Sequence, residues 1–553
     1  MASKLLSLVA ACALAACGGT SKPATVTLDG KAWTPPAVLV NVPADTPYLI
    51  AQLAPMSQEF RDRMFAQADA KIEEAMKLMA TLPADFDRSS LPAWIRVAFA
   101  WMDELKGKDM KHWSREMGLD ANQAFALYGL GVWPVARIGV NDAAKLQGTL
   151  ERILAKANVA TQQKELRGKK YWVFPIQQFS VVMAVLDKEM VASIVPTTAL
   201  DAALPKVLGL EKPAHSLGET DTLSASLAHY KLLPQAVFLV DVRGLAARFT
   251  KADAANPLEA PLSAATGPVT QACRDDIGRF VDVVPRVFGG YHRLDAKLMD
   301  FSLVAEMPPA LVKRLGRLSV PVPGVNPGLN GHPVFAFGWA MKSDELISLA
   351  KEVVKSVRDR PMRCDWFDGL NEAAENLGPK LSEPWIEQFK GNDGGTMVLE
   401  DWETERRYGE GSVTMVGSAA AQQAEMALKL VPGFGNLQLS TVGPPTEIPI
   451  GLLGGPPEMT AHILVRPQRA ALAVGKGSDK RVNLLVAAPT PTHSPLATMQ
   501  MNVPRLQALT NEKSTSYGMQ LDDLVMQLDL VEDGLEFNFK GTLPSAAAPV
   551  LAH

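Results

Sequence analysis

The chain lacks the patterns that mark most catalytic, nucleic-acid-binding and membrane-spanning proteins. No two of its eight histidines lie three or four residues apart, so no helical zinc pair is predicted, and neither a metal nor a cofactor is expected. A Gly-x-Ser-x-Gly elbow and a Walker loop are both missing. Lysines and arginines form no basic block, and the net charge is only −4 over 553 residues, which excludes a nucleic-acid-binding surface. After the first residues, no apolar run reaches the eighteen that a membrane-spanning helix needs.

A short secretory signal opens the chain. Lys4 gives it a positive flank, and the apolar stretch over residues 5–16 is too short to span a bilayer comfortably, which predicts a removable signal peptide over residues 1–16. Its end, Leu14-Ala15-Ala16-Cys17, resembles the lipobox of bacterial lipoproteins, in which the cysteine sulfur receives a diacylglycerol before cleavage. The resemblance implies that Cys17 is lipidated and becomes the mature N-terminus. An ordinary signal peptide with a chance cysteine is the alternative.

The same resemblance implies a location in the cell envelope. Gly18, and not aspartate, follows Cys17, which under the Gram-negative sorting rule favours the periplasmic face of the outer membrane. In a Gram-positive source the same anchor means the outer face of the plasma membrane. Residues 17–44, rich in Gly, Ser, Thr and Pro, are expected to be a tether. The membrane is therefore a partner of this protein through the lipid alone.

Cysteine is scarce, and the few that are present can be assigned. Of four cysteines, Cys12 leaves with the signal and Cys17 takes the lipid, which leaves Cys273 and Cys364. An even remainder in an exported protein favours a disulfide. It would close a loop of about 90 residues and stabilise the fold by about 4–5 kcal/mol in the chain-entropy model. Two buried free thiols are the alternative.

The body is predicted to be α+β, with antiparallel sheets and flanking helices arranged as two related halves. Pro234 to Phe238 opens a strand that a helix follows, and Pro333 to Phe337 repeats this pattern; generic α/β rhythm is the alternative reading. The Pro- and Gly-rich stretch 320–333 is the expected boundary. The expected domains are residues 45–325 and 326–545, followed by a tail over 546–553.

Individual elements can be predicted from periodicity and caps. Apolar residues recur at helical spacing over 57–82, and Ser90 is expected to cap a buried helix over 91–105. Asn141 or Asp142 should cap a helix that runs to Ala157. Strands are expected over 171–176, 179–186 and 190–195, with two more around Met299-Asp300 in 294–307 and another two around the 532–534 turn in 525–543.

Part of the body resembles a bacterial envelope protein family of unknown function. The motifs that carry the resemblance are Val42-Pro43-Ala44-Asp45-Thr46-Pro47-Tyr48, the strand–helix rhythm of 134–249, the Gly168 to Tyr171 strand and Leu223 to Leu227. The resemblance implies an envelope role and brings no catalytic residues with it.

The remaining clusters are interpreted as structural. Asp275-Asp276 is expected on a solvated helix face, and residues 400–405 on a surface strand with paired charges beside Arg406-Arg407. The uncharged loop 448–457 is either buried or an exposed binding surface, and burial is the default.

The function that these observations favour is that of a lipid-anchored cell-envelope protein without enzymatic activity. It is expected to have a structural, assembly or binding role, with an envelope protein as a candidate partner. One alternative is a periplasmic carrier of apolar ligands, which a large apolar cavity would support. Another is an envelope hydrolase, which a cleft with convergent His, Asp and Ser would support.

Overall fold

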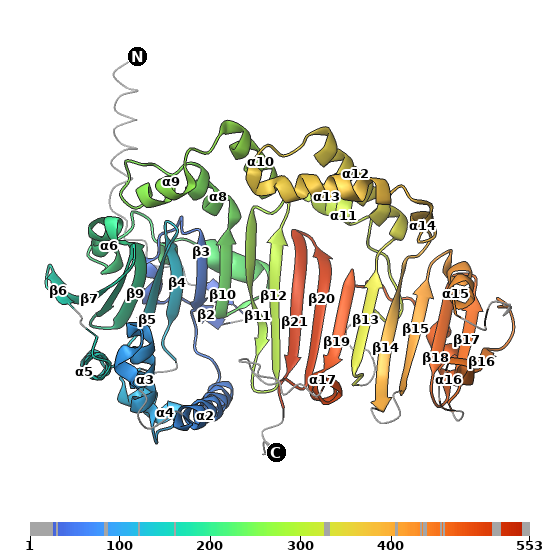
Figure 1. Cartoon of the computed structure of the whole chain (residues 1–553), viewed down its shortest axis with the longest axis horizontal. Coiled ribbons are helices and arrows are strands. Elements are labelled where there is room, and N and C mark those ends of the chain that lie inside the picture. Colours follow the sequence, from blue (N-terminus) through green and yellow to red (C-terminus); the bar gives the residue numbers. More distant parts are fainter. Residues whose placement is uncertain are drawn as a thin grey trace, which may run out of the picture.

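A computed structural model of the chain describes residues 26–28, 31–81, 87–119, 122–159, 162–325, 332–403, 408–431, 434, 439–453, 456, 459–510 and 521–544. Its main feature is a sheet of nineteen strands, which spans the whole width of the molecule (Figure 1). Every strand pairs antiparallel with its neighbours, and helices lie at the edges and ends of the sheet, so the fold is α+β. The predicted signal peptide, Cys17 and Gly18 lie outside the described residues, as does the tail 546–553.

The strands of the large sheet, in chain order, are β3 (Tyr48–Gln52), β4 (Phe125–Leu130), β5 (Trp133–Gly139), β6 (Gln162–Leu166), β7 (Lys169–Ile176), β8 (Phe179–Val185), β9 (Glu189–Pro196), β10 (Leu233–Asp241), β11 (Arg286–Leu294), β12 (Leu298–Glu306), β13 (Phe335–Ala340), β14 (Gly394–Glu403), β15 (Tyr408–Val416), β16 (Thr446–Ile448), β17 (Ala461–Arg466), β18 (Arg469–Val474), β19 (Ala497–Asn502), β20 (Asp523–Val531) and β21 (Gly534–Thr542). A separate small pair is formed by β1 (Val26–Leu28) and β2 (Lys31–Trp33).

The helices are α2 (Gln58–Ala80), α3 (Ala93–Leu105), α4 (Met110–Glu116), α5 (Ala143–Lys156), α6 (Leu200–Val207), α7 (Thr222–His229), α8 (Val242–Thr250), α9 (Ala260–Thr266), α10 (Gln271–Val281), α11 (Pro309–Leu315), α12 (Ser343–Asp359), α13 (Asp368–Lys380), α14 (Pro384–Glu387), α15 (Ala420–Lys429), α16 (Ser478–Ala487) and α17 (Val503–Thr510). Short 3₁₀ helices are η1 (Ala37–Asn41), η2 (Arg88–Ser90), η3 (Thr197–Ala199), η4 (Leu217–Glu219), η5 (Asp365–Phe367) and η6 (Ile450–Leu453).

The pairings give one linear order of strands: β6-β7-β8-β9-β5-β4-β3-β10-β11-β12-β21-β20-β19-β13-β14-β15-β18-β17-β16. Two stretches of this order have the same connectivity. One runs from β7 to β12 and the other, read in the opposite direction, from β16 to β21. In both, the fourth, fifth and sixth strands come first in the chain and the three inner strands come last.

The two parts meet at a symmetric pair of strands. Strands β12 and β21 each contain nine residues, and they pair over their whole length, with Leu298 opposite Thr542 and Glu306 opposite Gly534. Exchanging the two strands leaves this pairing unchanged, with Ser302 and Asn538 at its centre. A common order is what two related halves require, although it does not by itself establish a shared origin, and the two-halves expectation stays a prediction.

The body begins earlier than the sequence indicates. Leu39 and Val42 are fully buried, in the core that η1, α6 and α7 form against one side of the sheet, and Trp33 joins the same cluster. The expected tether over 17–44 is therefore wrong for its last dozen residues, because their few apolar side chains complete this core.

Most of the described elements follow their caps and periodicity. The helix predicted over 57–82 is confirmed as α2, which Ser57 caps, and Asp142 caps α5 as expected. The 171–195 strands and the 525–543 hairpin are confirmed. Ser90 does not cap α3, because it lies in η2 and Pro92 stands at the helix start. Nor is α3 buried throughout: it packs with α5, and of its side chains whose burial is described, Ala100 and Leu105 are buried while the others are partly or largely exposed.

The expectation of two strands around Met299-Asp300 is wrong. Strand β12 runs without interruption through both residues. The turn lies earlier, where the Asp295 carboxylate accepts hydrogen bonds from the backbone N–H groups of Lys297 and Leu298 at 2.8 and 3.0 Å. An Asx turn of this kind reverses the chain between β11 and β12.

Candidate functional site

The two cysteines singled out in the sequence lie together. Cys273 in α10 and Cys364, directly before η5, form a disulfide with their Cα atoms 4.4 Å apart. They are buried with Ile277 and Val281, so the bond joins α10 to the segment between α12 and α13. No role beyond stabilisation follows from its position in a closed apolar cluster.

The prediction that Asp276 lies on a solvated helix face is wrong. Its side chain is 1% exposed and not part of a solvated face. The carboxylate accepts hydrogen bonds from the backbone N–H groups of Arg363 and Cys364, the latter at 3.2 Å. Asp276 therefore holds the backbone that presents Cys364 to Cys273, which explains why a charged residue is tolerated in the interior.

Removing the disulfide should destabilise the protein without unfolding it. With a sequence separation of 91 residues, Cys273→Ser/Cys364→Ser should lose about 4–5 kcal/mol of unfolding free energy in the chain-entropy model. Urea denaturation of the variant, of wild type and of wild type with reductant measures the loss. Mass spectrometry of unreduced peptides should find the two cysteines linked; two alkylatable thiols in the exported protein would contradict the bond.

A polar cluster on β11, β12 and β21 contains the residue types of a hydrolytic triad. His292 Nε2 lies 3.0 Å from Ser302 Oγ and 3.4 Å from Glu536 Oε1, and its Nδ1 faces the Lys231 carbonyl oxygen at 3.2 Å. The Ser302 hydroxyl donates to Glu536 at 2.6 Å and accepts from the Asn538 amide at 3.0 Å.

This cluster does not have the geometry of a catalytic relay. A relay needs the carboxylate on the histidine nitrogen that faces away from the serine. Here Glu536 lies on the serine side, and Nδ1 contacts a backbone carbonyl instead. Ser302 is 1% exposed and gives its proton to the carboxylate, so no substrate carbonyl can approach it. The arrangement orders three strands and offers the hydrolase alternative no support.

The same cluster gives the stability a pH dependence. The hydrogen bond with Glu536 raises the pKa of His292, with Asp300 also contributing, and the histidine in turn lowers the pKa of Glu536. Because the folded pKa of His292 is raised, its stabilisation is complete below the ordinary value of 6.5 and is lost as pH rises through the folded value.

His292→Gln should therefore cost most in acid. We expect a loss of about 1.5 kcal/mol at pH 5.5, the contribution of a hydrogen bond to a charged group, and a smaller loss at pH 8. Urea unfolding at the two pH values measures this difference. A loss that is equal at both would contradict a protonated His292 in the folded state.

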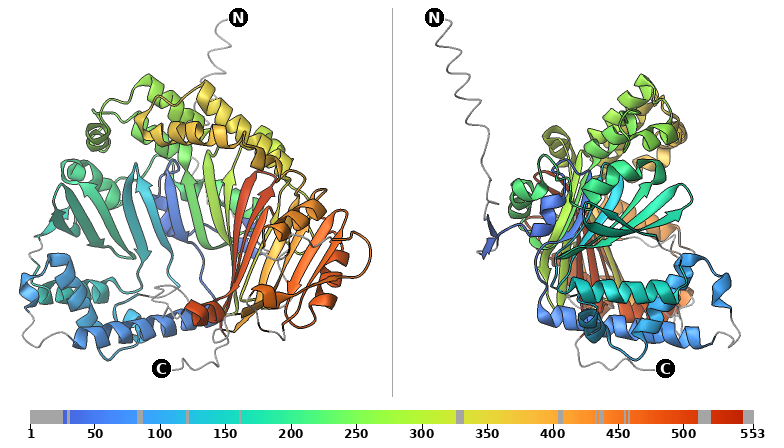
Figure 2. Two further views of the ribbon diagram at one scale, coloured as in Figure 1. Left: turned by 45° about the vertical axis from the view of Figure 1, so that its right-hand side comes forward. Right: turned by 90° about the vertical axis from the view of Figure 1, so that its left-hand side faces the viewer.

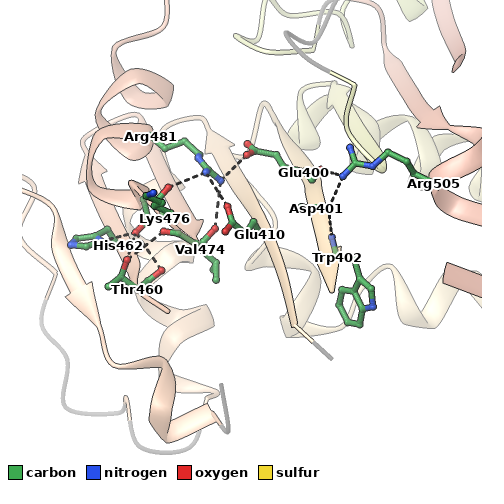
Figure 3. Close-up of polar contacts among 12 residues, drawn as sticks. Glu400, Asp401, Trp402, Glu410, Thr460, His462, Val474, Lys476, Arg481 and Arg505 are labelled. Carbon is green, nitrogen blue, oxygen red and sulfur yellow. Dashed lines mark hydrogen bonds and ion pairs between the residues drawn. The ribbon is translucent and has the colours of Figure 1, made fainter. Parts of the chain in front are cut away.

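A second polar network lies at β14 and β15, away from the centre of the sheet (Figure 3). Arg481 of α16 contacts Glu400 at 2.9 Å and Glu410 at 3.7 Å, while Arg505 of α17 contacts Asp401 at 2.6 Å. Glu400 and Asp401 are thus paired with cations, but the expected cross-strand pairing is wrong for Asp401, because Glu410 stands opposite it and the cations come from α16 and α17. Arg406 and Arg407 lie outside the described residues. Trp402 points away from these ion pairs (Figure 3).

The most unusual surface is one side of the central strands, which carries a continuous row of large apolar residues. Each residue of this row is opposite the next on neighbouring strands: Tyr291, Phe301, Phe539, Met526, Met499, Phe337, Met397 and Val413. Because paired residues point to the same side of a sheet, all of them lie on one face. We call this side of the sheet, from β3 to β15, the apolar face.

A neighbouring row on the same side of the sheet is also apolar. Ile50, Phe238, Leu303, Phe537 and Leu528 belong to a parallel row on this side. Among the described residues, no aspartate, glutamate, lysine or arginine stands on this side at the paired positions from β3 to β15. A charge-free region of this extent is not expected on a face that only meets water.

Behind the apolar face, one row on β12, β21, β20, β19 and β14 is polar and yet buried. On the side opposite the apolar face, the matching row contains Ser302, Asn538, Gln527, Thr498 and Thr396, and all of these are buried. On the apolar face, Ile50, Met397 and Phe537 are 45%, 46% and 40% exposed. Buried polar residues behind exposed large apolar ones indicate a face that is kept apolar for a ligand or partner.

Helices frame the apolar face without covering its middle. At one end, Leu146 and Leu150 of α5 pack on Met183 and Met190, and at the other, Ala424 and Leu428 of α15 pack around Ile463. Phe60 of α2 packs against Met299 at one corner. Figure 2 shows α5 and the bent strands β6–β9 standing to the same side of the central strands. Helices α5 and α15 therefore stand at the two ends of the apolar face, on its side of the sheet.

One surface pocket of the described part of the chain is lined mainly by charged residues. A cavity of about 470 Å³ between α12 and α13 is lined by Lys351, Lys355, Arg358, Asp359 and Glu375 among others. It does not have the apolar lining that the carrier alternative requires. Ile448 and Ile450 of the uncharged loop are buried, as the default reading had it; Gly454, Gly455 and Pro457 lie outside the described residues.

Over the described residues, no group of three or more His, Cys, Asp or Glu side chains is placed to hold a metal ion, and no helix combines the length and apolar character needed to cross a membrane.

Comparison with known proteins adds little. No protein-family model matches the chain, and no curated protein matches it. One solved structure, described as crystal form III of TP0453, is similar over 42% of this chain and 83% of that chain, with 9% identity and a TM-score of 0.20. A likeness at that TM-score supports no conclusion, and membership of the envelope family stays a prediction.

Sequence reasoning located the disulfide cysteines but missed the apolar face. The signal was present as alternation, with Leu535, Phe537 and Phe539 spaced by two in β21. Alternation identifies an apolar side, but not whether another layer covers it.

Proposed function

We propose that this protein is a lipid-anchored cell-envelope protein without enzymatic activity, whose apolar face binds an apolar ligand. Of the alternatives considered from sequence, this combines the envelope binding role with the carrier of apolar ligands. The observation that carries the proposal is the charge-free row from Tyr291 to Met397, lying on the less covered side of the sheet.

The anchor rests on the Leu14 to Cys17 motif, and it complements the binding role. A protein fixed to one leaflet samples the lipids and lipid-linked molecules of that membrane at high effective concentration. An apolar surface of this extent in water is costly unless an occupant covers it, because each square ångström of buried apolar area contributes about 25 cal/mol.

Titration with an environment-sensitive apolar dye tests the proposal. The full chain with Cys17→Ser, which keeps the protein free of lipid, should bind the dye, and lysines placed on the apolar face should abolish binding. Equal dye binding by the Cys17→Ser chain with and without these lysines would contradict a role for this face.

A further inference from the structure

We infer that the occupants of the apolar face are two acyl chains of membrane lipid, one on each half of the sheet. This inference rests on the proposed function and specifies its ligand. Three features of the apolar face favour hydrocarbon chains over other occupants: its lack of charged groups, its flanking helices and its repeated layout.

An extended polypeptide does not suit this face. Each of its residues would bring an N–H and a C=O group that lose water on binding. The backbone groups of the central strands are already paired with one another, and the side chains of the apolar face offer almost no donors or acceptors. Hydrocarbon chains bring no such groups and need none.

A second copy of the chain is also excluded by shape. Helices α5 and α15 pack on the same side as the apolar face, at its two ends. When two copies approach face to face, these helices meet before the central strands can touch. Thin flexible chains can enter between them.

The size of the face matches more than one acyl chain. The steps between neighbouring strands from β3 to β15, at about 4.8 Å each, add up to roughly 40 Å. A chain in one leaflet of a bilayer extends about 15 Å, half of the roughly 30 Å hydrocarbon core. Methionines at 397, 499, 501 and 526 supply flexible, polarisable contacts that adapt to chains of different length.

The layout of the face repeats on either side of the β12–β21 pair. Phe301 and Phe537 are both the fourth residue of their strands, and Leu303 and Phe539 are both the sixth. Farther out, Phe238 of β10 corresponds by strand order to Met499 of β19. Each half thus presents its own apolar set, which predicts two equivalent chain sites.

Native mass spectrometry of the full Cys17→Ser chain with hexadecanoic acid tests this inference. The Cys17→Ser chain without further changes should bind two molecules. Ile50→Lys in the first half and Met397→Lys in the second should each leave one, because each residue is about half exposed and its lysine can keep its ammonium in water without disturbing the fold. The double variant should bind none.

The matched control is Leu484→Lys, on α16, which is 73% exposed and adds the same charge away from the apolar face; it should still bind two. One molecule on the Cys17→Ser chain without further changes, or two on all variants, would overturn the two-site inference. If the acid fails to bind while the apolar dye still binds to this face, the ligand class is wrong but the proposed function stands. If neither binds, both fail.

Discussion

Three lysines on the apolar face should reduce apolar-dye affinity at least about 100-fold. The variant is Ile50→Lys/Met397→Lys/Phe537→Lys, and all three positions are 40–46% exposed in the unliganded protein. Each ammonium can therefore stay hydrated until a ligand covers it. Covering it removes its water without providing a partner, which costs several kcal/mol, and about 1.4 kcal/mol corresponds to tenfold in affinity.

The control adds equal charge elsewhere. Leu430→Lys/Val442→Lys/Leu484→Lys replaces three apolar residues that are more exposed and lie outside the apolar face. Its affinity for the dye should stay within about twofold of wild type. Circular dichroism and urea unfolding of both triple variants confirm that the fold is kept. A similar loss in both would mean that the dye responds to net charge or to general surface, and not to this face.

Cys17→Ala should release the protein completely from the membrane. Two or more acyl chains on one residue make anchoring effectively permanent, because each buried methylene contributes about 0.8 kcal/mol and a single chain already binds reversibly. Wild type should incorporate radiolabelled lipid and stay in the membrane fraction. The alanine variant should incorporate none and appear in the soluble fraction.

Two results would contradict the anchor. One is label incorporation that persists in Cys17→Ala, and the other is mature wild type that carries no lipid and retains Met1. Neither result would affect the apolar face, because that face is tested in the unlipidated chain.

The elements of this fold could be predicted where short-range signals specify them. Ser57 and Asp142 accept hydrogen bonds from the first turns of α2 and α5, and such caps depend on residues three positions apart. The alternation in β20 and β21 depends on a period of two. The sheet order could not be predicted, because β12 pairs with β21 across more than two hundred residues.

The exposure of the apolar face could not be predicted either, because it also depends on how distant segments pack. Alternating apolar residues ordinarily predict a side that faces the core. In β12 and β21 the covered positions include Ser302 and Asn538, while Phe537 on the other side is 40% exposed. Which side another layer covers is decided by where α5, α15 and η1 pack, and none of this is encoded near β12 or β21 in the sequence.

Methyl NMR of methionine-labelled protein tests most directly whether the apolar face binds hydrocarbon. With hexadecanoic acid added to the Cys17→Ser chain, the methyl signals of Met397, Met499 and Met526 should shift, while that of Met64, exposed on α2, should not. Shifts confined to methionines away from β14, β19 and β20, or no shifts at saturating ligand, would contradict the account.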